Sequence, residues 1–287
     1  MTGAPPGRRR DDERVQTYRR AGLEFGVRDS GPPHGDVVVL LHGFPQDGSA
    51  YDDVVPRLTA AGLRTLVPDQ RGYSAGARPA GRRAYRVPEL VADVVALLDA
   101  AGVPAVHVVG HDWGGAVAWA FAMEHPSRTR SLIALSTPHP AAARRAALRS
   151  SQLFRSAYIA FFQLPRLPER LLLADDGARL RALLVRSGLR EPWVGRYAER
   201  MLEPGALTAA LAWYRALGSA GRTPSTPVRV PTTHVHGRYD PFFAARGAEL
   251  TPHYVAGPFR SVTLDAGHWL PELHPEAVAD VVLERAR

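Results

Sequence analysis

Short apolar runs alternate with longer helical patterns along most of this chain. The run at 36–41 is rich in β-branched residues and is typical of a buried strand. Similar runs predict further strands at 64–68, 106–109, 131–135, 232–236 and 261–264, and apolar positions at helical spacing predict helices at 54–61, 87–101, 115–124 and 275–287. This alternation predicts the α/β class, with a mostly parallel sheet flanked by helices.

The pattern changes between about Pro138 and Pro227. This stretch is rich in Ala, Leu and Arg, is interrupted by several prolines, and contains no β-branched run before Val228. A chain of 287 residues is long enough for one large α/β domain that carries an insertion. We therefore expect a core domain from residues 1–137 and 228–287, and a helical lid domain from residues 138–227 inserted after the sixth or seventh strand.

A tight turn follows the predicted strand at 106–109. Its sequence, Gly110-His111-Asp112-Trp113-Gly114-Gly115, fits the nucleophile elbow Gly-x-Nuc-x-Gly, with an aspartate in the middle. Small residues flank such a turn because its backbone is strained, and the helix that follows stabilises a carboxylate at its N-terminus. Asp112 is therefore a candidate nucleophile. In the alternative interpretation, Asp112 only caps the helix of a glycine-rich turn.

An acid and a histidine follow in the order that a nucleophile elbow predicts. Asp240 comes after the predicted strand at 232–236, and His268 comes after the strand at 261–264. The carboxyl ends of strands in an open α/β sheet line the ligand crevice, so both side chains are expected to lie near Asp112. A carboxylate bound to one imidazole nitrogen leaves the other nitrogen free to deprotonate water.

A second turn is expected beside the elbow. His42-Gly43-Phe44-Pro45 comes directly after the strand at 36–41. The backbone N–H groups of Phe44 and Trp113 can converge on an anionic oxygen, which predicts an oxyanion hole.

These motifs make the resemblance specific. From about Val15 to its end the chain resembles the α/β-hydrolase superfamily, and its two turns look like those of the epoxide hydrolases. The resemblance implies two lid tyrosines that hydrogen-bond the epoxide oxygen, and Tyr158 and Tyr214 match that family's tyrosine segments. It also implies a covalent ester on Asp112. One departure is that the family usually has a tryptophan soon after the first turn, where this chain has Gly48 and Tyr51.

The implied substrate is a small apolar epoxide. Aromatic residues and one histidine are expected to contact it, namely His42, Phe161, Phe162, Trp213 and Trp269. The implied reaction needs no metal and no organic cofactor.

Composition adds limits. The net charge is +8, but the 36 basic residues are all arginine and are scattered along the chain. The run Arg8-Arg9-Arg10 is followed at once by three acidic residues. An ordinary solvated surface is therefore favoured over a nucleic-acid site. There is no cysteine, no apolar run of membrane-spanning length and no recognisable secretory signal. We expect a cytoplasmic enzyme that binds neither nucleic acid nor membrane and has a flexible tail of about a dozen residues; a homodimer stays compatible with the sequence.

Other activities of related chemistry remain as alternatives. Haloalkane dehalogenases share an aspartate followed by tryptophan, but usually have asparagine where Phe44 stands. Fluoroacetate-type dehalogenases usually have arginine where Trp113 stands. A serine esterase is disfavoured because Asp112 occupies the elbow, and the complete triad argues against a binding protein without catalytic activity.

Overall fold

The computed structural model describes residues 14–147, 150, 152–217 and 226–287, so the expected N-terminal tail and the Arg8–Arg10 run lie outside the described residues. Its centre is an eight-stranded sheet in the order β1-β2-β4-β3-β5-β6-β7-β8. The strands are β1 (Thr17–Arg20), β2 (Leu23–Ser30), β3 (Val37–Leu41), β4 (Arg64–Pro68), β5 (Val106–His111), β6 (Thr129–Leu135), β7 (Thr232–Gly237) and β8 (Phe259–Leu264). From β4 to β8 all neighbouring strands are parallel, whereas β1 and β2 are antiparallel to each other and β2 is antiparallel to β4. The predicted α/β class, with a mostly parallel sheet flanked by helices, is confirmed.

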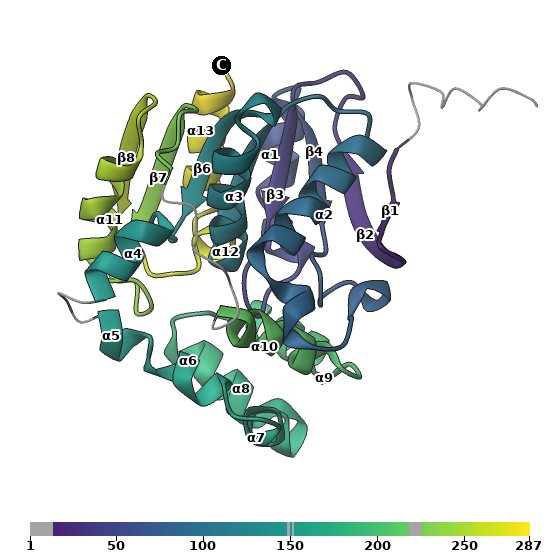
Figure 1. Ribbon diagram of the computed structural model, residues 1–287, viewed down its shortest axis with the longest axis vertical. Helices are drawn as coiled ribbons and strands as arrows, with labels where there is room; N and C mark the ends of the chain where they lie inside the picture. The colour runs from purple at the N-terminus through teal and green to yellow at the C-terminus, as the bar shows by residue number, and fades with distance from the viewer. Residues whose placement is uncertain (1–13, 148–149, 151, 218–225) are drawn as a thin grey trace, which may run out of the picture.

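Helices cover both faces of this sheet. Figure 1 shows α2 (Val87–Ala100) and α3 (Trp113–Glu124) in front of the sheet and α13 (Pro275–Ala286) with α1 (Val55–Ala60) behind it. Two further helices lie near β7 and β8, α4 (Pro140–Ala147) and α11 (Ala245–Leu250), and the short α12 (Leu270–Leu273) precedes α13. Within the described part of the chain, no helix has the length and apolarity needed to cross a membrane.

The chain between β6 and β7 is mainly helical in its described residues. After α4 come α5 (Gln152–Arg155), α6 (Ala157–Phe162), α7 (Leu167–Leu172), α8 (Ala174–Arg186), α9 (Trp193–Leu202) and α10 (Ala206–Ala216). Figure 1 shows α6 to α10 below the carboxyl ends of the central strands. These helices follow the sixth strand.

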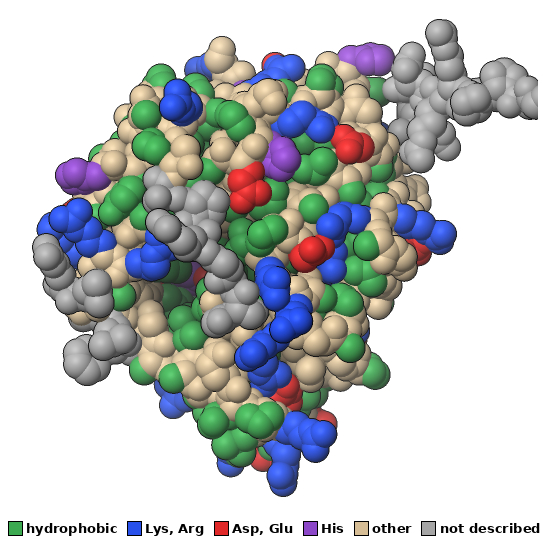
Figure 2. Space-filling model, in the orientation of Figure 1, with side chains coloured by type: hydrophobic (Ala, Val, Ile, Leu, Met, Phe, Trp, Pro, Cys, Tyr) green, Lys and Arg blue, Asp and Glu red, His purple; other side chains and the backbone are tan. Residues whose placement is uncertain are grey.

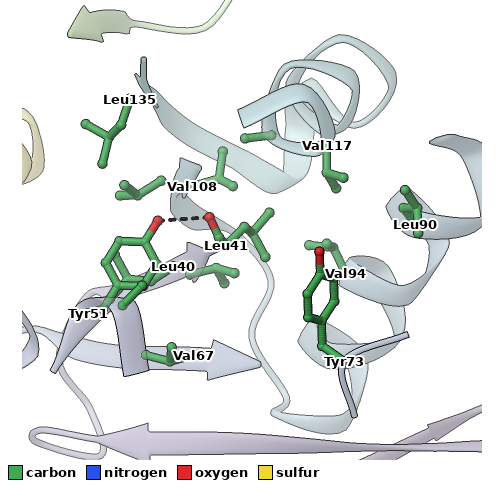
Figure 3. Packing of buried hydrophobic residues seen from close by; sticks show 14 of the residues in the cluster. Leu40, Leu41, Tyr51, Val67, Tyr73, Leu90, Val94, Val108, Val117 and Leu135 are labelled. Atoms are coloured by element: carbon green, nitrogen blue, oxygen red, sulfur yellow. Dashed lines mark hydrogen bonds between the residues drawn. The ribbon is translucent and has the colours of Figure 1, made fainter. Parts of the chain in front are cut away.

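The central strands are buried on both faces, as expected of parallel strands between two helical layers. Every residue of β3 and β5 is buried. Figure 3 shows Leu41 and Val108 between Tyr51 on one side and Val94 and Val117 from the helices on the other, with the Tyr51 hydroxyl donating to the Leu41 carbonyl at 2.8 Å. This packing fixes the ends of β3 and β5, from which the two predicted turns begin.

Two strands were not predicted from the sequence. β1 and β2 lie at the edge of the sheet, and only Tyr18, Phe25 and Val27 of their side chains are buried. An edge strand that buries alternate residues gives a weaker apolar signal than the fully buried run of β3.

Candidate active site

The turn between β5 and α3 has the geometry of a nucleophile elbow. Asp112 has φ 51° and ψ −118°, a conformation that a residue with a side chain rarely adopts. Its side chain makes no capping hydrogen bond to α3. The alternative in which Asp112 only caps the helix is therefore not supported by the local geometry.

Glycine is needed around this turn because backbone atoms approach too closely for any side chain. A Cβ atom at Gly110 would lie 2.2 Å from the Gly114 carbonyl oxygen, and one at Gly114 would lie 2.1 Å from the Leu41 carbonyl oxygen. A Cβ at Gly43 would lie 2.4 Å from the Asp112 Cβ. The glycines therefore allow the Asp112 turn to pack directly against the turn that follows β3.

Two backbone amides face the Asp112 carboxylate. The Phe44 N–H donates to Asp112 Oδ1 at 2.9 Å, and the Trp113 N–H, which follows Asp112 directly in the chain, also lowers the pKa of this carboxyl. Burial raises the pKa of Asp112, while His268 and these two amides act in the opposite direction. The Phe44–Pro45 peptide bond is cis. The Phe44 amide thus contacts the carboxylate directly, and the oxyanion hole of Phe44 and Trp113 stays a prediction.

The histidine and the second acid form a tight pair. His268 Nδ1 lies 2.8 Å from Asp240 Oδ2, and the other oxygen, Oδ1, accepts from the Phe242 and Phe243 amides at 2.7 and 3.0 Å. Burial opposes ionisation of Asp240, but His268 and the amides outweigh it and hold the pKa of this carboxyl below its usual value.

The free nitrogen of the histidine points to the elbow. His268 Nε2 lies 3.9 Å from Asp112 Oδ2. Burial lowers the pKa of His268, but Asp240 and Asp112 raise it by more, so the net shift is upward. The structure thus brings together Asp112, Asp240 and His268, which are far apart in the sequence.

A cavity of about 760 Å³ opens above Asp112. Both predicted tyrosines line it, Tyr158 from α6 and Tyr214 from α10, together with Trp113, Phe242 and Phe243. The space-filling view shows a hollow on the face drawn in Figure 2, and arginines spread across this face with acidic side chains among them. The described walls are mainly apolar and aromatic around the one carboxylate of Asp112.

The two phenols lie close to each other. The ring centroids of Tyr158 and Tyr214 are 5.9 Å apart. Burial raises the pKa of Tyr158, and Asp112 raises it further, while a hydrogen bond with Tyr214 opposes the shift. Burial also raises the pKa of Tyr214 well above its ordinary value, so both hydroxyls keep their protons at neutral pH.

None of the five predicted substrate contacts lines this cavity, and three of them, His42, Trp213 and Trp269, are buried in the fold. His42 is fully buried, with its Nδ1 3.0 Å from the Gly43 carbonyl oxygen and its Nε2 accepting from the Gln70 N–H at 3.1 Å. The Trp213 indole donates to the Arg71 carbonyl at 2.9 Å, and both it and Trp269 are buried. These residue types suit a pocket, but here they are packed or hydrogen-bonded elsewhere, which corrects their predicted role.

The remaining predicted contacts are also displaced from the cavity. Phe162 packs behind the wall, with its ring 5.0 Å from that of Tyr214 and 5.7 Å from that of Phe44. Phe161 is half-buried beside Phe162, and the Trp269 indole donates to Ser187 Oγ at 3.0 Å. Phe162 therefore supports Tyr214 from behind.

Sequence reasoning missed several residues around the triad. Phe242 and Phe243 supply both amides to Asp240 and line the cavity, and only Pro241 separates them from it in the sequence. Gln46 and Glu272 form a buried hydrogen bond at 2.6 Å although 226 positions separate them. The only sequence signal for that pair was its proximity to Pro45 and to His268. Among the described residues, no cluster of His, Asp and Glu has the arrangement of a metal site.

Comparisons with known proteins agree with this fold. Residues 36–275 match the family model for the α/β hydrolase fold. The chain is 35% identical to the AB hydrolase superfamily protein YfhM of Bacillus subtilis, over 96% of this chain and 98% of that protein. It is 32% identical to epoxide hydrolase A of Mycobacterium tuberculosis, over 92% of this chain and 94% of that protein. Among solved structures, it is similar to a mutant epoxide hydrolase from Bacillus megaterium bound to its diol product, with a TM-score of 0.83, 25% identity and coverage of 94% and 99%.

Proposed function

Because this chain belongs to the α/β-hydrolase fold family and its relatives include epoxide hydrolases, we propose that it hydrolyses an epoxide to a vicinal diol through a covalent ester on Asp112. One observation carries the proposal: a buried aspartate and two protonated tyrosines face the same apolar cavity. The enzyme would then be a hydrolase that acts on ether bonds.

The first half-reaction opens the epoxide. A carboxylate oxygen of Asp112 attacks an epoxide carbon, and the electrons of the broken C–O bond go to the epoxide oxygen. Tyr158 and Tyr214 hydrogen-bond that oxygen and supply a proton to the alkoxide as it forms. Such positioned acids contribute roughly 10²–10⁴-fold to a rate. The product is a hydroxyalkyl ester of Asp112.

The second half-reaction hydrolyses the ester. His268, oriented by Asp240, takes a proton from water, and the resulting hydroxide attacks the Asp112 carbonyl carbon. The Phe44 and Trp113 amides stabilise the tetrahedral oxyanion, which then collapses and expels the diol oxygen. The leaving diol oxygen takes the proton of the His268 imidazolium, and the proton left on the regenerated Asp112 carboxyl returns to the tyrosine pair, so every group regains its starting protonation state. No step requires a metal or an organic cofactor.

Residues 138–227 would act as the lid, with residues 1–137 and 228–287 as the core. Two lid helices, α6 and α10, carry the tyrosines, so their placement over the core would decide which epoxides react. The related Bacillus megaterium enzyme binds a naphthyloxy-propanediol as product. The aromatic wall of Trp113, Phe242 and Phe243 suits an aryl-substituted epoxide in the same way.

A three-substrate assay tests the activity. Styrene oxide, 1-bromobutane and a p-nitrophenyl ester are offered separately to the purified chain, and diol, bromide and nitrophenolate are measured. We expect diol from styrene oxide as the main product. Bromide without diol would make the chain a dehalogenase, and turnover of the ester alone would make it an esterase; either result would overturn the proposal.

The His268→Gln variant tests the ester. Alkylation does not need the histidine, but hydrolysis does, so the ester should accumulate. Intact mass spectrometry should show an increase equal to the mass of one epoxide, located on the peptide that contains Asp112. A variant that stays unmodified after incubation with styrene oxide would contradict the assignment of His268 to the second step.

Paired substitutions test the tyrosines. Tyr158→Phe and Tyr214→Phe should each slow alkylation by about 10²-fold, and the double variant should have no measurable epoxide opening. Tyr18→Phe is the control, since Tyr18 is buried on β1 and does not line the cavity. Normal alkylation by the double variant would remove the tyrosines from the mechanism.

A further inference from the structure

A buried carboxyl follows the catalytic histidine by four residues in the sequence. Glu272, on α12, is 5% exposed. Its Oε1 accepts hydrogen bonds from Gln46 Nε2 at 2.6 Å and from the Tyr197 hydroxyl at 2.8 Å. Its Oε2 is also buried and has no hydrogen-bond partner among the described residues. Glu272 is thus a buried acid whose hydrogen-bonding capacity is only half used.

The described partners of this carboxyl are neutral. Glu272 forms no ion pair with a described arginine, and both of its donors are uncharged groups. Burial raises the pKa of Glu272 to about 7, although Gln46, Tyr197 and His268 act against the shift. This carboxyl therefore changes its charge near neutral pH, in the range where a catalytic histidine also titrates.

The same network reaches the catalytic turns. Gln46 Oε1 accepts from the Gly43 N–H at 2.6 Å, directly before the residue whose amide faces Asp112. His111 Nδ1 lies 2.9 Å from the same oxygen of Gln46, and His111 Nε2 lies 2.9 Å from the His268 carbonyl oxygen. Burial lowers the pKa of His111 to about 3, so this ring stays neutral and adds no charge of its own.

The charges around His268 change during the proposed reaction. In the resting enzyme three carboxyl groups raise the pKa of His268, in the order Asp240, Asp112 and Glu272. Once Asp112 is esterified its charge is gone, and only two of the three remain. His268 becomes an imidazolium in this second step, when the nearby negative charge is lowest.

We propose that Glu272 is a positioning residue for ester hydrolysis: its carboxylate stabilises the imidazolium form of His268, while Gln46 and Tyr197 hold that carboxylate in place. This inference rests on the proposed function. It explains why Glu272 is buried without a cationic partner. Such burial destabilises the fold, and a purely structural contact would not offset that loss. It also links α9, which carries Tyr197, to the rate of the second step.

Several titratable groups face this pair and enter the interpretation of a pH profile. Asp240, Asp112 and neutral His111 face His268 from three different elements, and Tyr197 and Tyr51 face Glu272. Burial raises the pKa of Tyr51 and of Tyr197 well above the ordinary value, so neither phenol titrates near neutral pH. Only His268 and Glu272 are then expected to titrate there during ester hydrolysis.

The Glu272→Gln variant separates charge from shape. A glutamine carbonyl accepts the same two hydrogen bonds, so the geometry is kept while the charge is lost. Single-turnover reactions with styrene oxide are quenched over a range of pH, and intact mass follows the formation and decay of the ester. We expect alkylation to change by less than about twofold and ester hydrolysis at pH 8 to fall by about three- to tenfold. We also expect the acid limb of the hydrolysis profile to move to lower pH, because loss of the carboxylate lowers the pKa of His268.

Two further variants keep the test decisive. Tyr197→Phe removes one hydrogen bond that favours the ionised carboxyl, so it should move the acid limb in the same direction by less. Glu276→Gln, an exposed carboxyl on the neighbouring helix α13, should leave both steps unchanged. Slower hydrolysis with an unmoved acid limb in Glu272→Gln would mean a purely geometric role and would overturn the proposal. Should Glu272→Gln fail to fold, an unmoved limb in Tyr197→Phe would overturn it. Absence of any wild-type diol or ester would instead refute the proposed function.

Discussion

Two regions of this molecule bury carboxylates by different means. On α2, Asp93 accepts two hydrogen bonds from Arg71 at 2.7 Å and one from Arg20 at 3.0 Å. At the carboxyl edge of the sheet, Asp112 and Glu272 accept from amides and a phenol. Burial raises the pKa of both groups at the edge.

The two arrangements suit two roles of a buried carboxylate, one that stabilises the fold and one that takes part in the reaction. A guanidinium that forms two bonds to a carboxylate fixes its ionised state and its orientation. Neutral donors orient a carboxylate without cancelling its charge, so that the group stays available for attack or titration. Arginine pairing is therefore expected where the fold needs a fixed charge, and neutral pairing where the reaction uses the charge.

The largest effect should come from Asp112→Asn. The amide keeps the hydrogen bond from the Phe44 N–H but is not a nucleophile, so turnover of styrene oxide should fall by at least about 10⁴-fold. Stability should not fall, because the raised pKa means that the fold disfavours the ionised group. Diol formation and urea unfolding are measured on protein whose intact mass confirms the amide. A large loss of stability would mean that the Asp112 carboxylate stabilises the fold, as is proposed for Asp93. The proposed difference between the two regions would then be wrong.

Asp93→Asn should show the reverse pattern. Removal of this charge leaves Arg71 buried without its partner, and breaking such a pair costs about 3–5 kcal/mol in the free energy of unfolding. Styrene oxide turnover per folded molecule should stay within about twofold of wild type at a temperature where the variant is folded. Urea unfolding checks the first expectation and initial rates check the second. A loss of less than about 1 kcal/mol would show that the arginine pair is not structural.

Glu272→Gln should make stability less dependent on pH. Since the pKa of Glu272 rises from its ordinary value of 4.5 to about 7 on folding, the unfolded chain ionises first, and its contribution to stability is lost as the pH rises from about 4.5 through 7. The difference in free energy of unfolding between the variant and wild type should therefore shift in favour of the variant by up to about 3 kcal/mol from pH 5 to pH 8. Urea unfolding of both proteins at the two pH values measures this difference. A variant that is destabilised more at pH 8 than at pH 5 would have the wrong sign for a buried acid without a cation.

The smallest effect should come from an exposed ion pair. Arg57 and Glu276 form a pair at 2.6 Å, but 46% and 73% of their side-chain surface is exposed. Pairs of this kind are worth less than about 1 kcal/mol. Arg57→Ala should change the free energy of unfolding by no more than that and should leave turnover unaltered. A larger loss in the free energy of unfolding, measured by urea titration, would mean that this exposed pair stabilises the fold as strongly as a buried one. That result would contradict the proposed difference between exposed and buried ion pairs.

The sequence predicts the central sheet and the proximity of Asp112, Asp240 and His268 well because their signals are local. β3 is a continuous β-branched run because both of its faces are buried in the sheet. The apolar residues of α2 recur at helical spacing because only one face of that helix is buried. Asp112, Asp240 and His268 each follow a strand, and parallel strands bring such positions together at one edge. Chain order and strand ends were thus enough to assemble these three residues.

Side-chain direction and long-range pairing were not predictable in the same way. Trp213 and Tyr214 are neighbours on α10, yet only Tyr214 lines the cavity, because a step of one residue turns a helical side chain by about 100°. His42 looked like a pocket residue, but its two ring nitrogens contact backbone groups inside the fold. The bond between Gln46 and Glu272 depends on how two distant loops pack, and neither residue signals it alone.

The central claim is that the carboxylate of Asp112 is esterified and then regenerated by water. A single turnover of styrene oxide in water enriched in ¹⁸O, with enzyme in excess, tests this most directly. Water attacks the Asp112 carbonyl carbon in the proposed mechanism, so mass spectrometry should find ¹⁸O in the peptide that contains Asp112 and none in the first diol released. ¹⁸O in the diol with an unlabelled Asp112 would mean that water attacks the epoxide itself, and the account of this site would be wrong.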